Sequence, residues 1–588
     1  MVSMDDSSNP RAPAPMHPAT PLKRCAPRED CRRAPLFELA CALCQKHNRD
    51  NEIEDLDEAI TFHRAVLELR PVENDKYHRS TSLHHLALCL SYRYDEQGTV
   101  NDLEEAISLA RAALELCPPG HLNRGVYLHN LACDLRRRFV KQAAIHDLEE
   151  AIGLLRSALG LRPPGHPDRS STLHELALCL SNRHDKLGTI GDLDEAISCG
   201  RAALDLHPPG HSDRDGSLHK LACDLRKRFV KEVAICDLDE AIALHRIALE
   251  LRPLGHPDRS STLHELALCL SNRHDKLGTI GDLDEAISCG CAALDLHPPG
   301  HSDRDGSLHK LACDLRKRFV KEVAICDLDE AIALHRIALE LRPPGHPDRS
   351  STLHELALCL SNRHDKLGTI GDLDEAISCG RAALDLHPPG HSDRDGSLHK
   401  LACDLRKRFV KEVAICDLDE AIALHRIALE LRPPGHPDRS STLHELALCL
   451  SNRHDKLGTI GDLDEAISCG RAALDLHPPG HSDRDGSLHK LACDLRKRFV
   501  KEVAICDLDE AIALHRIALE LRPLGHPDRS STLHELALCL SNRHDKQGAA
   551  SDLEEAIALG RAALDLCPPG HSGRGTVLYG LACDVWKK

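Results

Sequence analysis

Apolar residues recur at helical spacing along most of the chain. In SSTLHELALCLSNRHDKLG (residues 170–188), four of them lie on one helical face: Leu173, Leu176, Ala177 and Leu180. In DLDEAISCGRAALDLHPPG (residues 192–210), the same spacing recurs at Leu193, Ala196, Ile197, Gly200 and Ala203. No segment alternates apolar and polar residues with period two, as a strand would. We therefore predict an all-α fold in which each unit contributes two helices, called A and B.

Local signals mark the ends of both helices. Thr172 and Glu175 offer a capping box at the start of helix A, and Gly188 is a natural stop at its end. Pro208 and Pro209 end helix B, because an interior proline removes a hydrogen bond and clashes, at a cost of ~3 kcal/mol.

The two-helix unit is repeated along the chain. DLDEAI, or its variant DLEEAI, occurs twelve times, and every step is 45 residues except the first, which is 47. A period of 90 lies over this one, since the block from His166 to Gly255 recurs from His256, His346 and His436 with changes at only two positions. Self-similarity of this kind is typical of repeat architectures.

The three carboxylates of DLDEAI suggest metal sites, acid/base pairs or a structural device. A calcium loop would need a D-x-D-x-D-G register and a distant Glu, which the motif lacks. We expect Asp192 to be the N-cap of helix B and Glu195 its capping-box partner. Asp194 and Glu195 then lie in the first turn, where the helix dipole favours carboxylates by ~0.3–1 kcal/mol each. The motif is predicted to be the start signal of helix B.

The two helical faces together resemble the tetratricopeptide repeat (TPR), whose unit has 34 residues. With Leu173 at position 4 of that repeat, positions 7, 8, 11, 20, 27 and 32 are matched by Leu176, Ala177, Leu180, Ala196, Ala203 and Pro208. The aromatics expected at positions 4, 11 and 24 are replaced by Leu, Leu and either Gly200 or His245. The 45-residue unit looks like the long repeats of the kinesin light chain type, and more closely like arrays typical of fungal TPR proteins.

The resemblance covers about residues 34–588. It implies a right-handed TPR-like α-solenoid of about 12 helix-turn-helix repeats, with an unpaired last helix. Residues 1–33 are rich in proline and polar groups and are predicted to be a disordered tail. The implied function is that of a protein-protein interaction scaffold, which binds a partner peptide or helix along the concave surface.

Candidate partner-binding residues lie on helix A, which lines the concave groove in that family. His174 and His219 take position 5 there, so a ladder of histidines is expected whose charge rises as the pH falls through ~6.5. Arg226 and Lys227, in LRKRFVKE, form either a solvated face or basic patches for acidic partner segments. The candidate residues are His174, Asn182, His219, Arg226, Lys227, His264, His309, His354 and His399.

The sequence contains no catalytic constellation. A G-x-S-x-G elbow and a phosphate-binding loop are both missing, so we expect neither an enzyme nor a cofactor. Cys41, Cys44 and His47 resemble a metal half-site, but they lie in a helix A core and are not expected to bind metal. His207 and His211 flank PPG and are expected to be loop histidines on a solvated surface, with metal buffering by such loops as a weaker hypothesis.

Composition limits the class of partner. A net charge of -17 and an aromatic content of 2% argue against nucleic acid. No stretch approaches the ~20 apolar residues of a membrane span, and the N-terminus lacks the apolar core of a signal peptide. The 27 cysteines stand singly at helical spacing rather than in a disulfide framework. A cytoplasmic protein is therefore expected.

A rival interpretation assigns the chain to a signalling protein. Large fungal relatives of this type often carry a caspase-like CHAT domain or a nucleotide-binding domain, and neither is visible in this sequence. The chain ends within a thirteenth helix A, at LYGLACDVWKK. The alternative function is thus a regulatory or sensor arm whose effector domain is absent from this chain.

Overall fold

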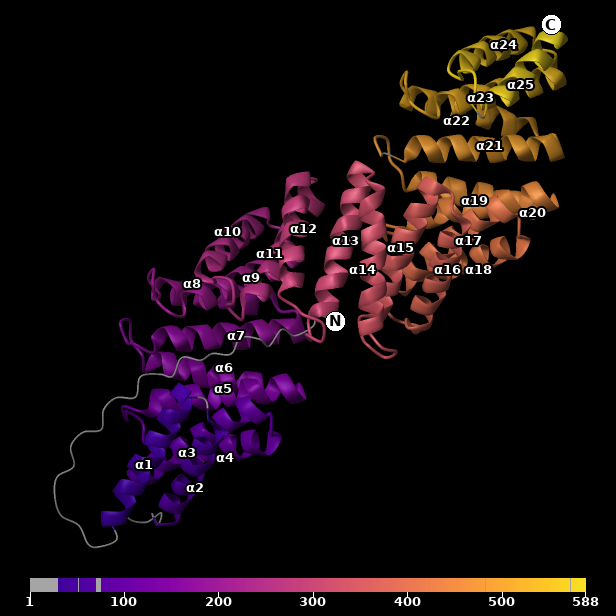
Figure 1. Cartoon of the computed structure of the whole chain (residues 1–588). Helices are drawn as coiled ribbons and strands as arrows, with labels where there is room; N and C mark the ends of the chain where they lie inside the picture. The colour runs from indigo at the N-terminus through magenta and orange to yellow at the C-terminus, as the bar shows by residue number, and fades with distance from the viewer. Residues whose placement is uncertain (1–29, 51, 70–75, 482, 572) are drawn as a thin grey trace. The chain divides into compact units, whose positions relative to one another are not determined.

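The computed structural model describes residues 30–50, 52–69, 76–481, 483–571 and 573–588. Within these ranges the chain forms α-helices joined by short loops and contains no strand, which confirms the all-α prediction (Figure 1). The tail predicted at residues 1–33 falls mostly on residues 1–29, which lie outside the described ones. Helix α1 begins at Asp30.

Helices A and B alternate along the described chain, as predicted. The A helices are the odd-numbered ones: α1 (Asp30–Asp50), α3 (Lys76–Gln97), α5 (Arg124–Gln142), α7 (Arg169–Leu187), α9 (Arg214–Glu232), α11 (Arg259–Leu277), α13 (Arg304–Glu322), α15 (Arg349–Leu367), α17 (Arg394–Glu412), α19 (Arg439–Leu457), α21 (Arg484–Glu502), α23 (Arg529–Gln547) and α25 (Arg574–Lys587).

Within each compact unit, a B helix packs against the A helix that precedes it and against the one that follows, as α8 does with α7 and α9. The B helices are α2 (Ile53–Glu68), α4 (Val100–Leu116), α6 (Ile145–Gly160), α8 (Ile190–Asp205), α10 (Ile235–Leu251), α12 (Ile280–Asp295), α14 (Ile325–Leu341), α16 (Ile370–Asp385), α18 (Ile415–Leu431), α20 (Ile460–Asp475), α22 (Ile505–Leu521) and α24 (Ala550–Asp565). The chain divides into two compact units, one up to Ser307 and one from Leu308 to Lys588.

The predicted apolar faces form the core of each helix pair. The residues of both faces are buried in the repeat of α7 and α8: Leu173, Leu176, Ala177, Leu180, Leu193, Ala196, Ile197, Gly200 and Ala203. Gly200 lets the next helix approach closely, because a Cβ at this position would lie 3.3 Å from Leu221 Cδ1 on α9. Burial of these side chains, at roughly 25 cal/mol per Å² of apolar surface, is the main stabilising term of the array.

Helix A ends in two different ways, of which the sequence predicts one. Gly188 caps α7 in the left-handed conformation with φ 69°, which confirms it as the stop signal. Val233 caps α9 with nearly the same geometry, at φ 61°. A β-branched residue is strained at positive φ, so the repeats that contain Val233 carry a local cost which those with Gly188 avoid.

The capping box expected at Thr172 and Glu175 is wrong. Helix α7 begins at Arg169, so Thr172 lies inside the first turn, where its hydroxyl donates to the carbonyl of Asp168 at 3.0 Å. Glu175 binds Arg136 of α5 instead. A glutamate at this spacing is typical of a capping box, but Glu175 forms an ion pair with an arginine of another repeat instead.

None of the helices in the described part of the chain is long and apolar enough to cross a membrane. The described cysteines are free, and most are buried or half-buried in the helix interfaces.

Candidate functional site

The three carboxylates of the DLDEAI motif join helix B to three neighbouring helices. Helix α8 begins at Ile190 with Thr189 as N-cap, so the N-cap position and the capping box expected for Asp192 and Glu195 are wrong. Asp192 instead accepts a forked pair of hydrogen bonds from Arg183 on the preceding helix A. This guanidinium lowers the pKa of Asp192 and outweighs the effect of its burial.

The other two carboxylates connect neighbouring repeats. Asp194 pairs with Arg228 of the following helix A at 3.1 Å, and Glu195 pairs with Arg156 of the preceding helix B at 2.6 Å. Arg228 also binds Asp237 of its own repeat, so one guanidinium joins two consecutive motifs. The carboxylates thus fix the register between repeats, and the expected first-turn position of Asp194 and Glu195 is wrong, because only Asp192 lies in the first turn.

A second set of ion pairs links consecutive A helices. Arg226 on α9 binds Glu265 on α11 at 2.8 Å, and Lys227 binds Asp185 on α7 at 2.7 Å. Beneath them, Ser181 donates to the buried carboxylate of Asp224 at 2.8 Å. Both candidate cations, Arg226 and Lys227, are thus already engaged within the array.

The histidine ladder lies on the A helices but is withdrawn from solvent. His174, His219, His264, His309, His354 and His399 are all half-buried, as is Asn182. Burial lowers the pKa of His219 and His309 to about 4 and also lowers the pKa of His174, His354 and His399. The expected gain of charge below pH ~6.5 is therefore wrong for His219 and His309, which remain neutral down to about pH 4.

The histidines of the loop after helix B are structural. His207 is buried, contacts Ser217 Oγ at 2.9 Å and stacks on His211 with ring centroids 4.3 Å apart. His211 Nδ1 accepts a hydrogen bond from the backbone amide of Asp213 at the start of the next helix. The expectation of solvated loop histidines is wrong for His207, because its ring fills the junction between helices.

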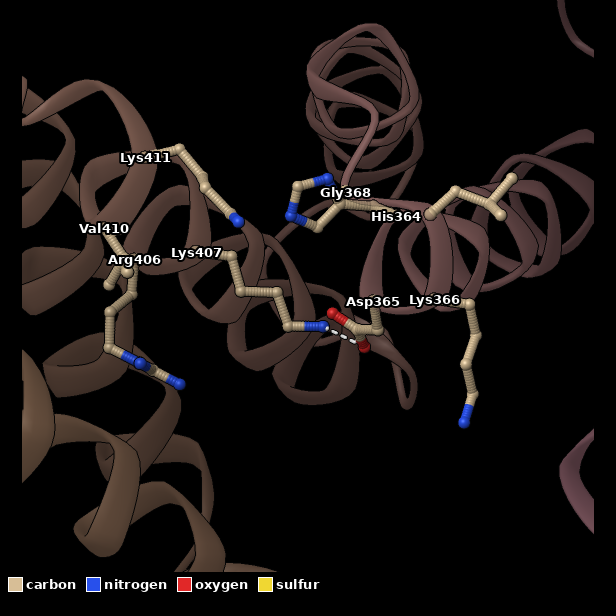
Figure 2. A pocket seen from close by; sticks show the side chains of 9 residues that line it. His364, Asp365, Lys366, Gly368, Arg406, Lys407, Val410 and Lys411 are labelled. Atoms are coloured by element: carbon tan, nitrogen blue, oxygen red, sulfur yellow. Dashed lines mark hydrogen bonds and ion pairs between the residues drawn. The ribbon is translucent and has the colours of Figure 1, made fainter. Parts of the chain in front are cut away.

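An open hollow of about 500 Å³ lies between the C-terminal ends of α15 and α17 (Figure 2). Leu367 and Val410 contribute exposed aliphatic side chains to it, and Lys407 reaches Asp365 across it. Lys366 and Lys411 also line it, and neither has an ion-pair partner among the described residues. The combination of free cations with exposed apolar groups suits a ligand that carries both carboxylates and apolar side chains.

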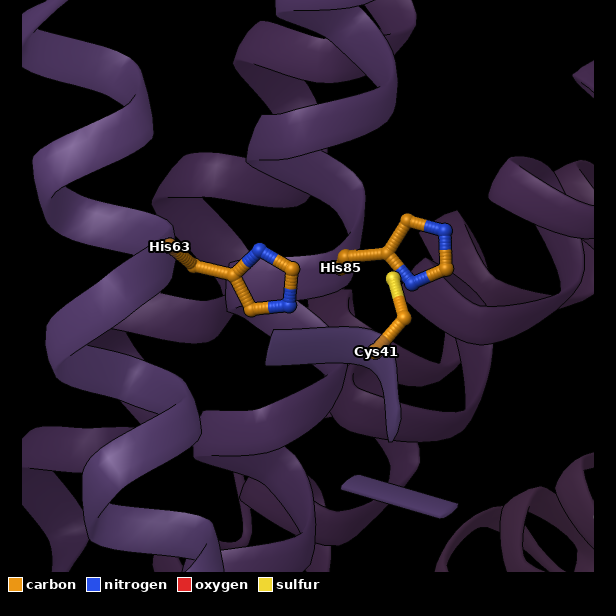
Figure 3. A group of neighbouring side chains, drawn as sticks. All are labelled: Cys41, His63 and His85. Carbon is orange, nitrogen blue, oxygen red and sulfur yellow. The ribbon is translucent and has the colours of Figure 1, made fainter. Parts of the chain in front are cut away.

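The half-site suggested by Cys41, Cys44 and His47 is not one cluster. Cys44 is buried in the core, and His47 Nδ1 contacts the carbonyl of Glu52 at 2.9 Å. Cys41 instead lies beside His63 and His85, which come from α2 and α3 (Figure 3).

A related cluster of His219, Cys223 and His245 recurs every 90 residues from α9 onward, a grouping that sequence reasoning missed. The sequence signal for this cluster is the i, i+4 spacing of His219 and Cys223, which places both residues on one face of a helix.

One family model, described as tetratricopeptide repeat, matches residues 125–168, which hold helices α5 and α6. No curated protein matches the chain. Solved structures with similarity to it include yeast Tom70, with 17% identity, 94% of this chain and 96% of that chain covered, and a TM-score of 0.31. The Cut9–Hcn1 hetero-tetramer of the APC/C has 15% identity, 95% and 97% coverage, and a TM-score of 0.37.

A Podosopora anserina putative kinesin light chain with nearly identical TPR-like repeats has 22% identity, 37% and 98% coverage, and a TM-score of 0.27. Identities and TM-scores this low support no conclusion about partners. The helix pair that the family model matches is repeated in register along the described chain, with the same A and B faces and the same DLDEAI or DLEEAI start. The match to the tetratricopeptide repeat is therefore shown for residues 125–168, and the other helix pairs share its pattern.

Proposed function

We propose that the chain is a protein-binding scaffold whose A helices hold a partner peptide. TPR-like folds generally mediate protein-protein interaction, and two features of this chain support a binding surface on the A helices. Consecutive A helices touch directly, as Ser181 and Asp224 show, whereas the B helices α6 and α8 are joined through the long side chains of Arg156 and Glu195. Closer spacing of the A helices favours a stack that curves towards them and gives the concave surface that repeat proteins use.

The hollow between α15 and α17 is the observation that carries the proposal. Its aliphatic groups, Leu367 and Val410, are 55% and 57% exposed. The same residues recur at Leu187 and Val230 and at Leu457 and Val500, with nearly equal exposure. Apolar groups beside lysines, as in the hollow between α15 and α17, match a segment in which acidic and apolar residues alternate along its length.

The A-helix ion pairs explain why the hollow rather than the histidine ladder is the contact point. Arg226 and Lys227 are held by Glu265 and Asp185, and the ladder histidines are half-buried, with the pKa of His219 lowered by burial to about 4. Lys366 and Lys411 remain available to an incoming carboxylate. Their charges also raise the local potential of a chain whose overall charge is negative, which steers acidic segments to this surface.

Selection from a library of displayed random peptides tests this proposal. The full chain is immobilised, and peptides are recovered at physiological salt. We expect the enriched sequences to combine Asp or Glu with Leu, Ile or Phe. Enrichment of basic sequences, or of no sequence at all, would contradict the proposal.

A further inference from the structure

Four clusters of two histidines and one cysteine are built into the array, each with one fully buried histidine and two half-buried residues. In the first, His219 and Cys223 lie one turn apart on α9, and His245 projects from α10. Cys223 Sγ is 3.6 Å from His219 Nε2, and one ligand atom from each of the three residues lies within 4.8 Å of the others. The arrangement recurs at Cys313, Cys403 and Cys493 with Sγ to Nε2 distances of 3.7 Å.

Hydrogen bonds fix the proton of His219 on the nitrogen that faces away from the cysteine. Thr262 Oγ1 donates its proton to the carbonyl of Asp258 at 3.0 Å, and it accepts from Arg252 at 2.5 Å. Its remaining lone pair accepts from His219 Nδ1 at 3.4 Å. His219 Nε2 therefore presents a lone pair to Cys223, which is the tautomer of a metal ligand whose second ring nitrogen is held by an outer partner.

His245 has no hydrogen bond on either ring nitrogen within the described structure, although it is fully buried. His335, His425 and His515 share both properties. A buried polar group without a partner destabilises the fold, and the repetition of this cost in four places points to a ligand that offsets it.

Packing does not require a histidine at this position. In helix α6 the equivalent residue is Leu155, which is fully buried, while the same repeat keeps His129 and Cys133 on α5. A leucine therefore fits between the same two helices, so the imidazole of His245 has another purpose.

The first repeat contains a similar cluster of two histidines and one cysteine, formed by residues at different repeat positions. Cys41 and His63 occupy the repeat positions of Cys223 and His245, but Phe37 stands where His219 would be. His85, from the next A helix, lies beside them and supplies the second imidazole (Figure 3). Two imidazoles and one thiol are thus brought together by two different combinations of positions.

We propose that each of the four clusters binds one thiophilic d¹⁰ cation, Cu(I) or Zn(II), through His219 Nε2, Cys223 Sγ and a ring nitrogen of His245, or their equivalents. Thiolate and imidazole are the ligands that these ions prefer. Sulfur at about 2.3 Å and nitrogen at about 2.0 Å from one tetrahedral ion lie about 3.5 Å apart, close to the 3.6 Å between Cys223 Sγ and His219 Nε2. On binding, the S–H bond breaks, a metal–sulfur bond forms, and the proton leaves to solvent.

The charges around the cluster favour Cu(I). One thiolate makes the Cu(I) complex neutral, whereas a Zn(II) complex would keep one positive charge. Arg226, three residues after Cys223 on α9, already pairs with Glu265 at 2.8 Å, so this carboxylate is not free to balance a second positive charge. A buried neutral complex needs no further counter-charge.

Native mass spectrometry of the full chain, after anaerobic loading with Cu(I) or with Zn(II), tests the proposal. The variant H245L/H335L/H425L/H515L replaces the buried histidine of all four clusters, and we expect it to bind four fewer ions per chain than the wild-type chain. The variant H335L should bind one fewer. The matched control is C236S/C326S/C416S/C506S, which replaces exposed cysteines outside the clusters and should leave the count unchanged. Circular dichroism confirms that each variant remains helical.

Two further measurements identify the bound ion and its ligands. Retention against a bicinchoninate competitor identifies Cu(I), and retention against pyridylazoresorcinol identifies Zn(II). X-ray absorption should show one sulfur and two nitrogen ligands per ion at the sites that the leucine variant loses. Equal metal content in the wild-type chain and the leucine variant, loss of metal in the exposed-cysteine control, or no retention of either ion would overturn the proposal.

Discussion

Arg228 on helix α9 binds both carboxylate oxygens of Asp237 on helix α10, at 2.8 and 2.7 Å. The carboxylate is almost fully buried, whereas the guanidinium keeps partial contact with solvent. A bidentate pair of this kind sets both the distance and the orientation of its two helices. The pair recurs in the later helix pairs, such as Arg183 with Asp192, whereas Lys46 takes the place of arginine beside Asp55 in the first one.

The substitution Asp237→Asn tests this clamp. It removes the charge that Arg228 faces and one of the two acceptors, so we expect the free energy of unfolding to fall by about 1–3 kcal/mol. Hydrogen exchange in the first turn of α10 should accelerate, while distant repeats stay protected, because each repeat is stabilised by its neighbours. Asp239→Asn is the control: its pair with Arg273 is exposed and contributes about 0–1 kcal/mol.

The buried pair of Arg136 and Glu175 predicts how stability depends on pH. Burial opposes the charge of Glu175, but Arg136, at 2.7 Å, outweighs it and lowers the pKa to about 2. A carboxyl whose pKa is lower in the folded state stabilises fully above its unfolded pKa, near 4.5, and this contribution is lost as the pH falls towards 2.

Thermal unfolding of Glu175→Gln between pH 2 and 7 measures this effect. We expect the variant to be less stable by about 3 kcal/mol at pH 7 and equal to the wild-type chain near pH 2. Glu195→Gln, which affects an exposed pair with Arg156, should follow the wild-type curve closely. A difference that stays constant over the whole range would show that Glu175 acts through packing rather than charge.

The valines that end helix A adopt the left-handed backbone conformation, so replacing one of them with glycine should stabilise the chain. Val413 ends α17 with φ 61° and is 48% exposed, so its side chain contributes little packing to offset the strain. Val413→Gly should raise the free energy of unfolding by up to about 1 kcal/mol. Gly368, with φ 72° at the end of α15, offers the reverse test. Gly368→Val should cost about 1–2 kcal/mol, measured in the same denaturant titration.

The sequence was sufficient to predict the helices, because apolar spacing and local stop signals are properties of one segment. Leu173, Leu176 and Ala177 are buried as their spacing predicts, and α7 ends at Gly188. The roles of the carboxylates were not predictable in the same way. Asp192 and Glu195 each pair with an arginine from another helix, so their function depends on which helices become neighbours.

The candidate surface was predicted only in part, for the same reason. Position along helix A placed His219 on the correct helix, but its burial arises from the packing of α10 and α11 against α9. Val413 was overlooked as a stop because valine is rare in the left-handed conformation. The hollow near Lys366 is formed by two helices from different repeats, and no single segment contains it.

The scaffold proposal is tested most directly by the affinity of a selected acidic peptide for two matched variants, measured by fluorescence anisotropy. K186A/K366A/K456A removes the exposed lysine next to Leu187, Leu367 and Leu457. R201A/R381A/R471A removes the same charge from exposed arginines on the B helices, where Cys291 of another repeat shows that arginine is dispensable. We predict that the lysine variant binds at least about tenfold more weakly, or ~1.4 kcal/mol, and that the arginine variant binds like the wild-type chain. Equal affinity of the two variants would contradict the account.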